Sequence, residues 1–271
     1  MEKVLHMTRN SLEILGAKII TTVRALGDWV GFVWHVLGWT FKRPYRWVLF
    51  FDQMEFVGVR STGIVALTAF FTGAVFALQA GKVYALFNME SLVGATVGLS
   101  LTREIAPVFA ALMVTARACS AMAAELGSMR VTEQIDALET MAVEPLQYLI
   151  APRVIATTIM TPLLTMLFNF VGIVGAYMVG IGILGIHEGP FMNRLYYMVD
   201  GEDIFVGIVK AAFFGFLIAA ISCYQGYKTR AGAAGVGRAT TRAVVISSVT
   251  ILVVDYFLTA WLLEFIIRPG R

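Results

Sequence analysis

The sequence contains few charged residues for its length. Only 14% of its 271 residues are Asp, Glu, Lys or Arg, whereas soluble domains carry about 25%. The hydrophobic share is 58% and the mean hydropathy is +0.77. Such a composition excludes an ordinary soluble globule and a disordered chain. The net charge is only +3 and the basic residues are scattered, so we expect no nucleic-acid partner.

Residues that build metal sites, disulfides and active sites are also scarce. The three histidines, His6, His35 and His187, lie far apart, and no HExxH or CxxC motif occurs. We therefore expect no metal site. Cys119 and Cys223 both lie in apolar stretches, which argues against a disulfide framework. Since GxxxxGKS and GxxxxGKT are also absent, we expect no nucleotide site, no cofactor and no catalytic residue in this chain.

Long apolar runs dominate what is present. A helix needs about 20 apolar residues to cross a bilayer. Five stretches meet this length, at residues 61–80, 92–124, 150–184, 204–224 and 243–267. No alternation of apolar and polar residues recurs in the manner of strands. The sequence therefore predicts an all-α, polytopic membrane protein with five transmembrane helices.

Lysine and arginine predict how these helices are oriented. Fourteen of them fall in the first sixty residues or in the loops after the second and fourth spans, and four fall on the opposite side. The positive-inside rule then places the N-terminus in the cytoplasm, and an odd number of spans places the C-terminus outside. Glu2, Arg9 and Glu13 interrupt the start of the chain, so we expect residues 1–16 to be retained rather than removed as a signal peptide.

Residues 1–50 form a separate N-terminal region in this interpretation, and residues 51–271 form the membrane domain. Apolar residues recur at helical spacing from Leu12 to Val23, and four of the five tryptophans lie between Trp29 and Trp47. Tryptophan favours the headgroup level of a membrane. We predict an amphipathic helix lying in the cytoplasmic interface. A sixth span is the alternative.

The ionisable residues inside the predicted spans include Arg103, Glu104, Arg117, Lys210 and Asp255. Such groups are costly in hydrocarbon and are usually paired or functional. All except Arg117 lie at similar depths, so these two cations and two anions could neutralise one another. Both a structural ion network and a polar site for an anionic headgroup remain open. Arg103 and Arg117 are fourteen residues apart and should share a helix face, with Arg117 deeper and structural.

Small residues recur at a spacing of four in two spans, at Gly94 and Gly98 and at Gly172, Ala176 and Gly180. In lipid, such stripes allow two helix backbones to approach closely. Packing within one chain and a homodimer interface both explain them.

Two segments between spans carry further patterns. Residues 125–142 combine an apolar stripe (Ile135, Leu138, Met141 and Ala142) with an acidic row (Glu133, Asp136 and Glu139). This pattern predicts a short amphipathic helix before Pro145, which is either a solvated connector or a docking helix for a cytosolic partner. Residues 232–242 are rich in glycine and basic, and we expect them to form a loop.

Several motifs together closely resemble the MlaE/YrbE family of ABC-transporter permeases. They are LTREIAPV at 101–108, AAELGSMRVTEQIDAL at 123–138, Pro152 with Arg153, GVGRATTRAVV at 235–245, and DYFLT at 255–259. The resemblance covers roughly residues 55–267. It implies a homodimer in the bacterial inner membrane, with ABC ATPase subunits that bind ATP and Mg²⁺, a possible STAS-domain protein, a periplasmic ring of MCE-domain proteins, and phospholipid as substrate.

The resemblance also implies roles for individual residues. Residues 125–142 match the family's coupling helix, which enters a groove of the ATPase, and the coupling residues are Glu125, Arg130, Glu133, Asp136 and Leu138. The polar positions of the lipid cavity are Arg103, Glu104 and Lys210, and apolar positions assigned by their offset from the motif are Phe76, Tyr84 and Phe87. Asp255 and Arg117 are interpreted as buried charge partners. Lys82 departs from the family pattern.

Two other classes of function remain as alternatives. A proton- or ion-coupled secondary transporter could use the same buried charges, and an inverted repeat would favour it, but none is evident in the sequence. The second alternative is a non-transporting membrane scaffold for a periplasmic ring.

Overall fold

The computed structural model describes residues 2–40, 46–230 and 232–265, and within these ranges it contains helices and no strands. For residues 2–16, 18, 19, 22 and 263–265 it describes the backbone alone. Five helical stretches in the described ranges are long and apolar enough to cross a membrane: Trp47–Ala85, Glu90–Val131, Leu146–Gly182, Gly201–Tyr227 and Gly232–Leu262. The predicted all-α membrane fold with five spans is confirmed.

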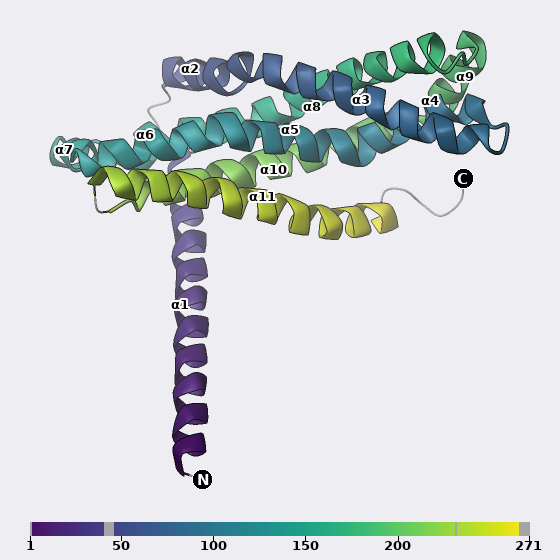
Figure 1. The fold of residues 1–271 in the computed structure, drawn as a ribbon. Coiled ribbons are helices and arrows are strands. Elements are labelled where there is room, and N and C mark those ends of the chain that lie inside the picture. The colour runs from purple at the N-terminus through teal and green to yellow at the C-terminus, as the bar shows by residue number, and fades with distance from the viewer. Residues whose placement is uncertain (1, 41–45, 231, 266–271) are drawn as a thin grey trace.

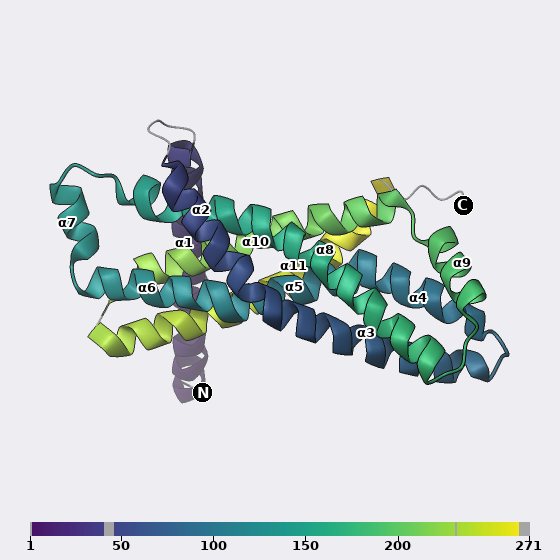
Figure 2. The same ribbon diagram turned by 90° about the horizontal axis from the view of Figure 1, so that it is seen from above.

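Most of these stretches are chains of shorter helices joined without a loop. The first consists of α2 (Trp47–Val57) and α3 (Thr62–Ala85), and the fourth and fifth are α10 (Gly201–Tyr227) and α11 (Gly232–Phe265). The second joins α4 (Val93–Ser100), α5 (Ala106–Val114) and α6 (Ser120–Val131), and the third is mainly α8 (Ala151–Gly182). They lie side by side in one elongated bundle, as Figures 1 and 2 show. Within it, α8 packs most extensively on α3 and α10.

The helix α1 (Glu2–Thr40) runs crosswise to this bundle in both views (Figures 1 and 2). It contacts the end of α10, where the Phe32 ring lies 5.3 Å from that of Tyr224, and Lys228 Nζ donates to Asp28 Oδ2 at 2.7 Å. This hydrogen bond to Asp28 raises the pKa of Lys228 and favours its charged form. A helix that lies in the membrane interface runs crosswise to the spans, so this orientation favours the interfacial helix over a sixth span. The side chains of Leu12, Leu15 and Ile19 lie outside the described residues.

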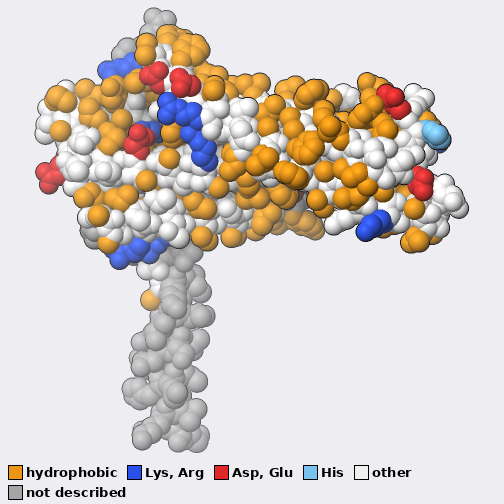
Figure 3. Space-filling view, turned by 45° about the horizontal axis from the view of Figure 1, so that its top comes forward, with side chains coloured by type: hydrophobic (Ala, Val, Ile, Leu, Met, Phe, Trp, Pro, Cys, Tyr) orange, Lys and Arg blue, Asp and Glu red, His pale blue; other side chains and the backbone are white. Residues whose placement is uncertain are grey.

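Polar and apolar side chains are separated along the bundle. Hydrophobic side chains cover the middle of the face shown in Figure 3, while charged side chains gather mainly at the end crossed by α1, here called the α1 end. Because the hydrocarbon core excludes charge, this distribution places the middle of the bundle in the membrane.

The stripes of small residues face other helices of the same chain. A Cβ at Gly73 of α3 would lie 1.9 Å from the carbonyl oxygen of Gly172 in α8. Gly94, Gly98 and Gly180 face side chains of α9 (Glu188–Met198), chiefly Phe191 and Leu195. These stripes therefore pack helices within one chain, which accounts for them without a homodimer interface.

Replacing Gly73 by alanine is expected to destabilise the fold by about 1–3 kcal/mol, because the added methyl group would force α3 and α8 apart. The matched control is Gly63→Ala in the same helix, where a Cβ would meet nothing within 4 Å. Thermal unfolding in detergent measures both. Equal unfolding temperatures for the two variants would contradict the close contact.

Two predicted segments differ in the structure. Residues 232–242 are not a loop but the first turns of α11, and only Gly232, at φ +64°, requires the conformational freedom of glycine. The predicted coupling helix is divided, because α6 continues to Val131 and α7 spans only Gln134–Thr140. The β-branched Val131 and Thr132 disfavour continuation of α6, and Glu133, at φ +60°, reverses the chain into α7.

Candidate functional site

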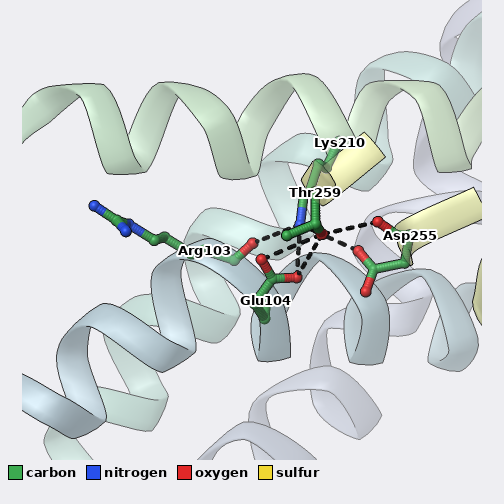
Figure 4. A network of polar contacts seen from close by, with 5 residues as sticks. All are labelled: Arg103, Glu104, Lys210, Asp255 and Thr259. Carbon is green, nitrogen blue, oxygen red and sulfur yellow. Dashed lines mark hydrogen bonds and ion pairs between the residues drawn. The ribbon is translucent and has the colours of Figure 1, made fainter. Parts of the chain in front are cut away.

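The ammonium group of Lys210 lies at the centre of a buried polar cluster (Figure 4). Its side chain is 0% exposed, and Nζ lies 2.6 Å from Glu104 Oε2 and 3.2 Å from Asp255 Oδ1. Nζ also donates to the hydroxyl oxygen of Thr259 at 2.6 Å. These distances agree with the predicted neutralisation of Lys210 by Glu104 and Asp255. Three segments far apart in sequence meet here: the second span, α10 and α11.

A fourth acceptor of Lys210 is the backbone carbonyl of Arg103, at 3.2 Å. In an α-helix this carbonyl would accept the N–H of the residue four positions later, which is Pro107 and has none. The segment η3 (Leu101–Ile105) is correspondingly a π-helix. Its close neighbour on α10 is Gly207, where a Cβ would lie 2.4 Å from the carbonyl oxygen of Thr102. Pro107 thus leaves the Arg103 carbonyl without its α-helical donor, and Gly207 lets α10 approach closely. Lys210 can therefore donate to this carbonyl.

The side chain of Arg103 points away from Lys210, as Figure 4 shows. Its Nε and Nη2 both lie 2.6 Å from Asp203 Oδ1. The other oxygen of Asp203 accepts the backbone N–H of Asp200 at 3.0 Å and closes a capping box at the start of α10. The prediction of one cluster containing all four charges is therefore wrong for Arg103, because the carboxylate of Asp203 in the first turn of α10 pairs with it.

The exposed fraction of the side chain differs sharply among Arg103, Glu104 and Lys210. The Arg103 side chain is 26% exposed and that of Glu104 is 41% exposed, whereas Lys210 is completely covered. An anion approaching from outside would therefore meet Arg103 first. It could reach Lys210 only after Glu104 or Thr259 moved.

An apolar groove of about 470 Å³ lies between α3 and the second span. Its lining comes from the middle of α3 and from the second span: Thr68, Phe71, Thr72, Val75, Phe76, Ile105 and Phe109. Ile105 belongs to η3, the segment that also carries Arg103 and Glu104. Phe76 lines this groove. Tyr84 instead shares a hydrogen bond with the Thr96 hydroxyl at 2.8 Å, and Phe87 is exposed beyond the end of α3.

Comparison with known proteins identifies the family. The family model described as Permease MlaE matches residues 50–261. The chain belongs to the MlaE permease family. A probable ABC transporter permease protein of Rickettsia felis is 41% identical over 253 residues, which cover 93% of this chain and 98% of that protein. The intermembrane phospholipid transport system permease protein MlaE of Haemophilus influenzae is 39% identical over 258 residues, covering 94% and 98%.

Arg117 of this MlaE-family permease holds together the junction of α2 and α3. Its Nη1 donates to the carbonyl of Phe56 and to Ser61 Oγ, and its guanidinium lies 5.1 Å from the centre of the Phe56 ring. It therefore contacts a different part of the bundle from Arg103, and the predicted shared face is wrong. The π-helical segments η3 and η4 (Thr115–Cys119) change the helical register between the two arginines.

The predicted coupling residues of the MlaE-family permease divide into two groups at the α1 end. Glu125 pairs with the buried Arg153 at 2.7 Å, and Arg130 pairs with Asp136 while lying 5.6 Å from the Tyr227 ring. The pair of Glu125 joins α6 to α8, and the contacts of Arg130 hold α7 against α6. Glu133 is exposed and Leu138 is half-buried, and the outer surface of α7 also presents Ala137 and Met141. This outer surface is available to a partner.

Sequence reasoning missed two members of the site, Asp203 and Thr259. The predicted fourth span began at Ile204, so Asp203 was placed outside the membrane. The pattern of Asp200 and Asp203 could have identified a capped helix start. Thr259 lies one turn after Asp255, but this spacing does not distinguish a threonine that contacts Lys210 from one that only bonds its own backbone.

Proposed function

We propose that this MlaE-family permease is the membrane subunit of an ATP-driven transporter of phospholipids. The observation that carries the proposal is an apolar groove whose lining includes Ile105 of η3, the segment that also carries Arg103 and Glu104. A phospholipid has acyl chains that suit Phe71, Val75 and Phe76, and a phosphate that suits the exposed part of Arg103. The name of the Haemophilus influenzae relative, as an intermembrane phospholipid transport permease, agrees with this assignment.

The assembly that we propose has several further components. Two copies of the chain form a homodimer around the grooves in the bacterial inner membrane, with N-termini in the cytoplasm and C-termini in the periplasm. ATP and Mg²⁺ bind to separate ABC ATPase subunits, which contact the outer surface of α7. A STAS-domain protein binds on the cytoplasmic side, and a periplasmic ring of MCE-domain proteins passes the lipid on. The names of the Rickettsia relatives as ABC transporter permeases support the ATPase partner.

The second span connects the proposed ATPase contact at α7 to the charged residues of η3. Residues Glu90–Val131 form one continuous helical stretch that ends beside α7 and contains Glu104. Binding of ATP by the partner would press on α7 and displace this stretch along its length. The groove would then narrow and expel the acyl chains, while Asp203 holds Arg103 in position before and after the phosphate leaves.

The test is transport of a fluorescent phospholipid by the complete complex in proteoliposomes. We expect transport to require ATP, and Arg103→Met to lower lipid occupancy and transport at least tenfold. Arg60→Met is the matched control, because Arg60 is an exposed arginine that pairs only with the exposed Glu55 in the described ranges. Unchanged occupancy in Arg103→Met would contradict the headgroup role. Transport driven by a proton gradient without ATP would instead support a secondary transporter.

A further inference from the structure

A second cavity, of about 510 Å³, lies at the α1 end of the bundle and shares no lining residue with the groove. It forms where α1 and α2 meet the start of the third span, which includes the π-helical segment η5 (Leu146–Ile150). Among the described residues, its lining includes Trp39, Arg46, Trp47, Glu144, Tyr148, Ile155 and Ile159. Its size is within the range of cavities that hold small ligands, roughly 300–1,000 Å³.

The lining combines two membrane environments. Trp39 and Trp47 are residues of the type that gathers at the headgroup level. Ile155 and Ile159 lie on the same face of α8, one turn apart, within the span Leu146–Gly182. A ligand that fills the cavity therefore needs a polar part at the interface and an apolar part that contacts the isoleucines. A membrane phospholipid meets both requirements.

The charges in the cavity specify the polar part further. Arg46 and Glu144 both line it. The guanidinium of Arg46 lies 4.5 Å from the centre of the Tyr148 ring, and neither Arg46 nor Glu144 forms an ion pair with another residue of the described ranges. Among the described lining residues, one cation and one anion without a charged partner match a headgroup that carries both a phosphate and an ammonium group.

We propose that this cavity binds a zwitterionic aminophospholipid of the leaflet at the α1 end. The phosphate contacts Arg46, the ammonium group contacts Glu144, and an acyl chain packs on Ile155 and Ile159. This lipid is distinct from the transported one, and the proposal does not depend on the transport function. By filling the space between α1, α2 and α8, the lipid would fasten the crosswise helix to the bundle.

Photocrosslinking tests the proposal on the full-length chain in detergent. The probes are phosphatidylethanolamine and phosphatidylglycerol, each with a diazirine in the acyl chain, and mass spectrometry maps the adducts. We expect adducts at the start of α8, with a yield at least fivefold higher for phosphatidylethanolamine. Adducts spread evenly along the lipid-facing surface, or a higher yield for phosphatidylglycerol, would overturn the assignment.

Matched variants separate the two parts of the site. Ile155→Trp fills the cavity and should lower the yield at least fivefold, while Leu163→Trp, on an exposed part of α8 two turns further, should leave it unchanged.

Glu144→Gln should remove the preference for phosphatidylethanolamine without lowering the yield for phosphatidylglycerol. Arg46→Gln should lower both yields at least threefold, and Arg60→Gln should lower neither. Because Arg46 is exposed, its variant tests the site even if Ile155→Trp fails to fold. Wild-type yields in both Ile155→Trp and Arg46→Gln would overturn the proposal.

Discussion

Replacing Lys210 by methionine is expected to destabilise the protein by about 3–5 kcal/mol, because removal of one member of a buried ion pair leaves the other charge uncompensated. Two carboxylates, Glu104 and Asp255, would lose their cation at once. The carbonyl of Arg103, to which Pro107 has no N–H to donate, would lose the hydrogen bond from Lys210 as well. We expect lipid transport to fall below detection. The measurements are thermal unfolding of the purified protein and ATP-dependent transport by the complex.

A control and a compensating variant make this result specific. Lys82→Met removes an exposed lysine from the last turn of α3 and should change neither measurement. Adding Glu104→Gln and Asp255→Asn to Lys210→Met removes the uncompensated charges and should restore part of the stability without restoring transport. A single Lys210→Met variant that unfolds at the wild-type temperature would show that the cluster contributes little.

Reversing the charge of Glu133 and Asp136 together to lysine is expected to reduce copurification of the ATPase subunit at least tenfold. Both carboxylates are exposed at α7, where we place the partner. The added lysine at position 136 would also repel Arg130, which now pairs with Asp136 and helps to hold α7. Recovery of ATPase activity with the affinity-purified permease measures the effect.

Two further variants separate docking from local structure. Asp136→Asn removes the pair with Arg130 without adding positive charge, and the ATPase should largely remain bound. Glu55→Lys adds positive charge to an exposed position of α2, which we do not assign to the contact. Wild-type ATPase recovery with the double reversal would exclude α7 as the docking element.

The features that depend on composition and spacing were predictable. The five spans follow from apolar length, and the cluster of Glu104, Lys210 and Asp255 follows from the cost of leaving charges unpaired in hydrocarbon. The features that depend on local departures from regular helical geometry were not predictable. Ideal helical spacing predicted a shared face for Arg103 and Arg117, but two π-helical segments alter the register along that span.

Most of the other differences between the prediction and the structure concern where helices begin and end. The structure assigns Asp203 to the first turn of α10, whereas the hydrophobic pattern begins one residue later. The divided coupling helix and the helical residues 232–242 depend on single turns at Glu133 and Gly232, where the backbone adopts positive φ. Tertiary contacts decide such turns, and one sequence does not reveal them.

The cluster around Lys210 has one acceptor more than it can satisfy. An ammonium group has three hydrogens, and Nζ has four acceptors within reach: the oxygens of Glu104, Asp255, Thr259 and the Arg103 backbone. The ammonium can therefore exchange one acceptor for another while it keeps three hydrogen bonds. A small shift of the second span, α10 or α11 that lengthens one of these contacts leaves Lys210 hydrogen-bonded through the remaining acceptors.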